Sequence, residues 1–128
     1  MIMEAEMGER RILVVDDDRT TCMIVQSMLV QRGYKVDYAL AGMAALKHFE
    51  ETEYDLALLD YQMPGMNGIE LCERIHDISP GTIAVFLTAH PTINTIFPAI
   101  GPGVERVLAK PVDSRELVPL VENLIGAP

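Results

Sequence analysis

The sequence has no tryptophan, only two cysteines, few aromatic side chains and a shortage of positive charge. Cys22, Cys72 and three scattered histidines do not supply the clustered ligands of a zinc site, so we expect both cysteines to be reduced and buried. Ten basic residues against nineteen acidic ones give a formal net charge of -9, which disfavours nucleic acid as a direct partner. No apolar run is long enough to span a bilayer.

The N-terminal residues 1–10 are acidic and lack the apolar stretch of a signal peptide. We therefore predict a cytoplasmic protein with a flexible extension at residues 1–10. The length of 128 residues is that of one domain, and the composition, 49% hydrophobic and 23% charged, is typical of a globular protein. We place that domain at residues 11–126.

Short apolar runs alternate along the chain with segments whose apolar residues follow helical spacing. The runs predict strands at residues 11–15, 35–38, 56–59, 82–87 and 104–109. Helices are predicted after Asp18, over residues 41–51, after the capping residue Asn67, and from Asp113 to about residue 125. This order predicts an α/β fold with a five-stranded parallel sheet, doubly wound by helices on both faces through right-handed crossovers.

Some helical positions carry more specific expectations. Met43, Leu46 and Phe49 have the spacing of a core-facing stripe, whereas His48 and His76 are expected on the solvated surface. A further helix belongs between residues 91 and 103 by the alternation. Proline, glycine and β-branched residues in that segment predict that it is short and irregular.

Four of the five predicted strands end in polar side chains. Asp16 and Asp17 follow the first strand, Asp60 follows the third, Thr88 the fourth and Lys110 the fifth. All four ends lie on one edge of a parallel sheet, where open α/β sheets bind ligands. Crowded carboxylates repel one another unless a cation joins them, and Mg²⁺ takes carboxylate and phosphate oxygens. The set predicts phosphoryl transfer onto Asp60, with its carboxylate as the nucleophile.

Each of these residues also has an ordinary structural explanation when it is taken alone. An aspartate such as Asp60 often opens a turn, and the Asp16–Asp18 cluster would serve as a helix cap. Thr88 would simply end a strand, and Lys110 would lie on the surface. The prediction of a phosphoryl-transfer site therefore depends on their joint placement at successive strand ends.

The chain resembles the receiver domains of two-component response regulators. The resemblance covers roughly residues 10 to 125, and four motifs carry it: Val14-Val15-Asp16-Asp17-Asp18, Leu59-Asp60-Tyr61-Gln62-Met63-Pro64-Gly65-Met66-Asn67-Gly68, Leu87-Thr88-Ala89 and Ala109-Lys110-Pro111. It implies a flavodoxin-like strand order 2-1-3-4-5. It also implies a phosphoacceptor signalling domain rather than an enzyme, with autocatalytic phosphorylation and dephosphorylation only.

The resemblance assigns a role to each acid. Asp60 would accept a phosphoryl group from a phosphohistidine on a sensor histidine kinase or a histidine phosphotransfer protein. Asp17, Asp60 and the backbone carbonyl of Gln62 would bind Mg²⁺ directly, and Asp16 would act through water. Lys110 would pair with the phosphoryl oxygens.

The remaining roles concern the switch. Thr88 would hydrogen-bond the phosphoryl group, and the Lys110–Pro111 peptide bond resembles the family's cis bond, for which proline is the one suitable residue. Val107 stands where the family often has an aromatic residue, so the coupling of Thr88 to an aromatic is not expected here. Gln62 and His90 occupy positions that tune the lifetime of the phosphoryl bond in the family, and we expect His90 to be an exposed loop residue.

Other functions stay open on the sequence alone. The run from Asp16 to Thr20 also fits the D-x-D-x-T signature of haloacid-dehalogenase-type phosphatases, in which Asp16 would be the nucleophile. A receiver-like contact module that no longer cycles phosphate is a second alternative. We also hypothesise that residues 91–103 form a mobile output face. A homodimer is a further possible partner. The sequence does not name the cognate kinase or the output pathway, and it does not say whether this domain stands alone or whether phosphorylation creates a dimer.

Overall fold

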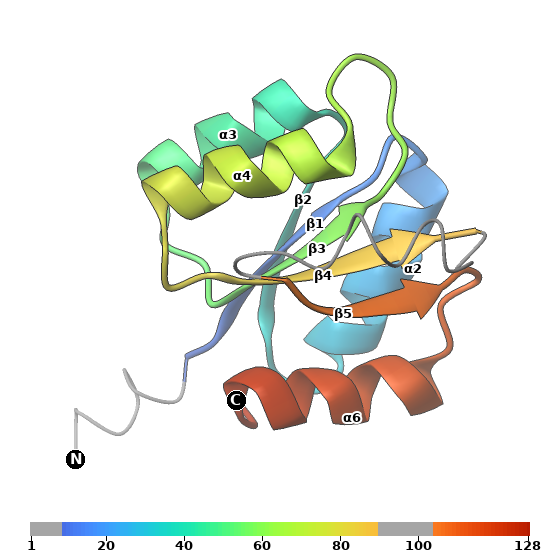
Figure 1. The fold of residues 1–128 in the computed structure, drawn as a ribbon. Coiled ribbons are helices and arrows are strands. Elements are labelled where there is room, and N and C mark those ends of the chain that lie inside the picture. Colours follow the sequence, from blue (N-terminus) through green and yellow to red (C-terminus); the bar gives the residue numbers. More distant parts are fainter. Residues whose placement is uncertain (1–8, 90–103) are drawn as a thin grey trace.

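A computed structural model describes residues 9–89 and 104–128, apart from the side chain of residue 105 (Figure 1). Its strands form one parallel sheet in the order β2-β1-β3-β4-β5, which confirms the expected topology. The strand bounds are β1 (Arg11–Val15), β2 (Lys35–Ala39), β3 (Leu56–Asp60), β4 (Ile83–Thr88) and β5 (Val104–Ala109). Each agrees with the sequence prediction to within a residue or two.

The helices lie in two layers. Helices α3 (Gly42–Glu51) and α4 (Gly68–Ile78) cover one face of the sheet, and α2 (Arg19–Val30) and α6 (Ser114–Ile125) cover the other (Figure 1). Several predictions lie outside the described residues. They are the helix within residues 91–103 and its hypothesised mobility, the exposure of His90, and the flexibility of residues 1–8. No helix among the described residues is both long enough and apolar enough to cross a bilayer.

Three helices begin as their capping residues predict. Asp18 accepts a hydrogen bond from the backbone of Thr20, and Asn67 accepts one from the backbone of Glu70. Asp113 does the same for the backbone N–H of Arg115 at the start of α6. Each cap satisfies a backbone donor that a helix N-terminus would otherwise leave without a partner.

The core is divided by the sheet. Alternating residues of β1 point to opposite layers: Ile12 and Val14 pack toward α2 and α6, and Leu13 and Val15 pack toward α3 and α4. Cys22 and Cys72 are free and buried, one in each layer, as expected. Both faces of β1 and β3 are therefore buried, which explains their unbroken apolar sequences.

Two expectations about side-chain exposure are wrong. Met43 is 67% exposed, because the buried stripe of α3 runs through Gly42, Ala45, Leu46 and Phe49, and Met43 lies on the next face of the helix. The two helical histidines are half-buried rather than fully solvated.

The half-burial of His48 has a local cause. Tyr54 donates a hydrogen bond from its hydroxyl to Asp37 Oδ2 over 2.6 Å, and the same hydroxyl lies 3.3 Å from His48 Nδ1. The imidazole thereby covers one side of a buried tyrosine. Tyr54, in the segment just before β3, therefore decides the position of His48, and helical spacing alone does not reveal this contact.

Candidate functional site

The carboxyl edge of the sheet brings together side chains from the ends of β3 and β4 and from the segments that follow β1 and β5. Asp16 follows β1, Asp60 is the last residue of β3, and Thr88 is the last residue of β4. Thr88 is buried, and its carbonyl oxygen accepts a hydrogen bond from the backbone N–H of Lys110 over 2.8 Å. This bond fixes the end of β5 beside β4, and so it places Lys110 at the same edge as the acids.

Three carboxylates form a cluster at this edge. One oxygen each of Asp16, Asp17 and Asp60 lies within 4.8 Å of the others. Asp16 is fully buried, Asp60 is 5% exposed, and Asp17 faces solvent. Asp18 has a separate function, since its carboxylate caps α2 and accepts a hydrogen bond from the Thr21 hydroxyl over 2.9 Å. The sequence Asp16–Asp18 thus divides into two site residues and one cap.

Lys110 supplies the positive charge of the cluster. Its Nζ lies 2.6 Å from Asp16 Oδ2 and 3.3 Å from Asp60 Oδ1. Burial opposes the charged form of Lys110, but hydrogen bonds and the negative charges of the two aspartates outweigh it and raise the pKa of the amine. The lysine is therefore held as a cation. The Lys110–Pro111 peptide bond is cis, as expected.

The carboxyl group of Asp60 resists ionisation. Burial and then the negative charge of Asp16 raise its pKa from 3.8 to about 6, and Lys110 offsets part of this rise. A second cation beside the acids would relieve the remaining repulsion. Three carboxylates within reach of one point are hard oxygen ligands of the kind that Mg²⁺ takes. The residues present therefore fit a magnesium ion.

The loop from β3 to α4 is pressed against the acid that precedes it. The backbone N–H of Gln62 donates to Asp60 Oδ1 over 3.3 Å. Gly68 lies so close to the strand that a Cβ there would stand 2.8 Å from the carbonyl oxygen of Asp60 and 2.7 Å from the ring of Phe86. Only glycine allows this approach without displacing a neighbour. The glycine therefore sets the path of the loop that surrounds Asp60.

Two further contacts support the site from outside it. Met66 of the same loop covers Gly42, where a Cβ would stand 2.9 Å from its sulfur. Cys22 Sγ lies 3.3 Å from the carbonyl oxygen of Asp16, beneath the acid pair, and burial raises the pKa of this thiol to about 11. Neither the close approach of Gly68 nor this contact of Cys22 is predicted from the sequence. The one available signal was a glycine in the first turn of a helix, where glycine is a poor helix former.

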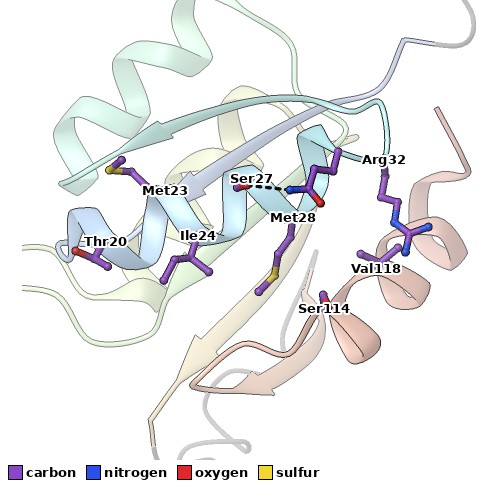
Figure 2. Close-up of a pocket in the computed structure, with 9 residues that line it drawn as sticks. Thr20, Met23, Ile24, Ser27, Met28, Arg32, Ser114 and Val118 are labelled. Atoms are coloured by element: carbon purple, nitrogen blue, oxygen red, sulfur yellow. Dashed lines mark hydrogen bonds between the residues drawn. The ribbon is translucent and has the colours of Figure 1, made fainter.

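A separate groove of about 500 Å³ lies between α2 and α6 (Figure 2). Met23 and Ile24 of α2 are 52% and 50% exposed on it, and Ser114 and Val118 of α6 form its other side. The groove is distinct from the acid cluster.

Comparison with known families identifies this arrangement. The model of the response regulator receiver domain matches residues 12–122. The chain belongs to the response regulator receiver family. Receiver domains are signalling domains of two-component systems, and the Asp16, Asp17 and Asp60 pocket fits both Mg²⁺ and a phosphoacceptor aspartate.

Curated relatives are longer than this receiver domain. The transcriptional regulatory protein ZraR of Escherichia coli is 35% identical over 115 residues, which are 90% of this chain and 26% of the relative. The transcriptional regulatory protein ResD of Bacillus subtilis is 33% identical over 120 residues, which are 94% of this chain and 50% of the relative. The chain thus spans about a quarter to a half of the length of these regulators.

Solved receiver structures match over nearly their full length. A CheY-like receiver domain protein from Methanospirillum hungatei has a TM-score of 0.86 at 29% identity, with 91% of this chain and 94% of that chain covered. The response regulator TrrA from Thermotoga maritima, solved in complex with Mg²⁺ and BeF, has a TM-score of 0.80 at 31% identity, with 90% and 98% covered. These matches agree with the strand order found here.

Proposed function

We propose that this receiver domain carries a phosphoryl group on Asp60, delivered by a sensor histidine kinase or a histidine phosphotransfer protein. One observation carries the proposal. Asp60 is the acid at the end of the central strand, with Lys110 Nζ 3.3 Å from its Oδ1 and two further carboxylates beside it. A nucleophile, a cation for the phosphoryl oxygens and metal ligands therefore meet at one point.

In the proposed transfer, a carboxylate oxygen of Asp60 attacks the phosphorus of the phosphohistidine. A phosphorus–oxygen bond forms, the phosphorus–nitrogen bond breaks, and the imidazole leaves with the electron pair and takes up a proton. The raised pKa of Asp60, about 6, still leaves the carboxylate predominantly ionised at neutral pH, as the attack requires. Hydrolysis of the resulting acyl phosphate would reset the domain.

Asp17, Asp60 and the backbone carbonyl of Gln62 would hold Mg²⁺, with Asp16 acting through water. When bound, the ion would neutralise charge on the transferred group and on the acids around it. Lys110 stays positively charged between Asp16 and Asp60, so its amine is available to the phosphoryl oxygens. The Mg²⁺ and BeF named for the TrrA structure support this assignment by relationship.

Thr88 would hydrogen-bond the phosphoryl group once it is present. Its place at the end of β4, in register with the residue before Lys110, supports this role. Val107 is half-buried against the α3–α4 layer. Because valine has no ring that could swing with Thr88, the switch would pass through the backbone after β4.

The experiment is the intact mass of the protein after incubation with acetyl phosphate, with and without Mg²⁺. Wild type should gain one phosphoryl group in the presence of Mg²⁺, and Asp60→Asn should gain none. Asp16→Asn tests the dehalogenase-type alternative, in which Asp16 would carry the phosphate. The complete burial of Asp16 and its ion pair with Lys110 argue against that alternative. A gain that survives Asp60→Asn would refute the proposal.

The proposal also covers the output of the domain and its binding partners. Relatives that are transcriptional regulators suggest that the output is DNA binding by another part of a regulator, with no direct nucleic acid contact by this acidic domain. Bounds of 11–126 for the receiver domain, a flexible segment before them and a cytoplasmic location also stay predictions. A contact module without phosphate cycling is the outcome if Mg²⁺ binds but no phosphoryl group is gained.

A further inference from the structure

A second groove, of about 540 Å³, lies between α3 and α4, on the face of the molecule opposite α2 and α6 (Figure 1). Met43 and Ile78 line it and are 67% and 47% exposed, while Leu46 beside them is buried. They are two of the five large apolar side chains that are exposed among the described residues. This groove therefore holds apolar area that a partner surface would remove from water.

The charged residues of the groove have a regular order. On α3, Lys47 is followed three positions later by Glu50, and on α4, Arg74 is followed three positions later by Asp77. All four line the groove. The charges of these four lining residues sum to zero, in a chain whose formal net charge is -9.

The four charges form two rows across the helices. Because α3 and α4 each return from the carboxyl end of a parallel strand, they run in the same direction (Figure 1). Lys47 lies five positions after the start of α3, and Arg74 six positions after the start of α4. Gly42 at the start of α3 lies beside Met66, two residues before α4, so the two helices begin at similar heights. With a rise of about 1.5 Å per residue, we infer that the cations lie at nearly one level and the anions roughly one turn further along.

We propose that this α3–α4 face is an interface between two copies of the chain, related by a two-fold axis perpendicular to the two helices. Such an axis lays each helix antiparallel over its own copy. The row of Lys47 and Arg74 of one copy then lies over the row of Glu50 and Asp77 of the other. A two-fold axis parallel to the helices would instead place like charges together, so the charge order selects one arrangement.

The strength of this association follows from its size and charges. Arg74 also pairs with Glu70 of its own helix over 3.2 Å, but both side chains are exposed and such a pair holds its members only weakly. The two helices have only 10 and 11 residues, about 15 Å each, so we expect the contact to be smaller than the roughly 800 Å² per partner of a stable interface. The dimer is therefore weak and depends on concentration. The dimer does not require phosphorylation of Asp60. A negative result for the dimer would therefore leave the proposed function untouched, and the reverse also holds.

The test is sedimentation equilibrium of the full chain from micromolar to millimolar concentration. The average mass should rise from the monomer value of 14.2 kDa toward twice that value. Met43→Glu should weaken association by about tenfold or more, because the dimer would then bury an unpaired glutamate at its interface. Met23→Glu, at a comparably exposed methionine in the α2–α6 groove, is the matched control and should leave association unchanged.

A charge exchange tests the orientation. Lys47→Glu should weaken association, and Lys47→Glu combined with Glu50→Lys should restore it, because the antiparallel α3 helices again oppose unlike charges. Circular dichroism would confirm that each exposed substitution leaves the fold intact. A wild type that stays monomeric at millimolar concentration overturns the proposal, as does an equal effect of Met23→Glu and Met43→Glu. Failure of the double variant to recover overturns the proposed axis.

Discussion

Replacement of Asp60 by asparagine should make the metal-free protein more stable at neutral pH. Asp60 is 5% exposed, and burial, followed by the charge of Asp16, raises its pKa from 3.8 to about 6. The folded state therefore disfavours the ionised carboxylate relative to the unfolded chain. Asparagine has a similar shape without the charge, and it leaves Lys110 paired with Asp16. The substitution removes a cost that the acid cluster imposes on folding.

The magnitude follows from linkage. A rise of about two pH units corresponds to about 3 kcal/mol of unfolding free energy, at about 1.4 kcal/mol per unit. Because the folded pKa lies above the unfolded one, wild type carries no penalty below about pH 3.8. The penalty grows through about pH 6 and is complete above it. The stability gap between Asp60→Asn and wild type should therefore be near zero at about pH 4 and largest above neutrality.

Urea unfolding with a chelator present measures this gap, followed by far-ultraviolet circular dichroism because the chain has no tryptophan. Glu73→Gln, which removes a negative charge from an exposed position of α4, is the matched control and should change stability little. Equal stability of Asp60→Asn and wild type above neutral pH, or a gap that does not shrink toward about pH 4, would refute the reasoning.

Three further predictions concern the loop and the charges around the site. Gly68→Ala should lower stability by about 1–3 kcal/mol in urea unfolding, because its Cβ meets backbone at 2.8 Å, whereas Gly81→Ala, with nothing within 4 Å, should be neutral. Mg²⁺ should raise the thermal midpoint of wild type and raise that of Asp17→Asn much less; equal rises in calorimetry would contradict the assignment of Asp17 as a ligand. Lys110→Ala should reduce the yield of phosphorylated protein more than it reduces Mg²⁺ affinity, as mass spectrometry and a metal titration would show; a larger loss of Mg²⁺ affinity would oppose its proposed role.

Much of the fold follows from local sequence. The apolar runs that become β1 and β3 are buried on both faces, so their pattern is unbroken and their ends are marked by acids. Asp18, Asn67 and Asp113 mark helix starts because their side chains bind backbone donors within a few residues. Signals of this range are visible in a single sequence.

The location of the site could be predicted from the sequence, but the distances between its side chains could not. A parallel sheet brings the ends of β1, β3, β4 and β5 to one edge, and this was enough to group Asp16, Asp60 and Lys110. The contact of Lys110 with the buried Asp16, shorter than its contact with Asp60, depends on side-chain packing between distant segments. So does the close approach of Gly68 to β3. No local pattern encodes such distances.

The errors have the same origin. Met43 has the spacing of a core residue, but the buried stripe of α3 begins one position earlier, at Gly42, which Met66 covers. The side chain of Met43 is therefore exposed to solvent. His48 was expected to be solvated, and a tyrosine from the segment before β3 covers it instead. In each case a residue outside the helix, Met66 or Tyr54, decides the outcome of a helical position.

The sheet that separates the two core layers also has an evolutionary consequence. Neighbouring residues of β1 such as Leu13 and Val14 belong to different layers, and among residues 9–89 and 104–128 the buried clusters on the two sides share no residue. The effects on stability of substitutions in the two layers should therefore add where the sites are more than about 7–10 Å apart, and each layer can adjust mainly through its own side chains. The α3–α4 surface can therefore adapt to a new binding partner while the α2–α6 surface keeps its existing contacts. The acid cluster at the carboxyl edge of the sheet lies where the two layers meet.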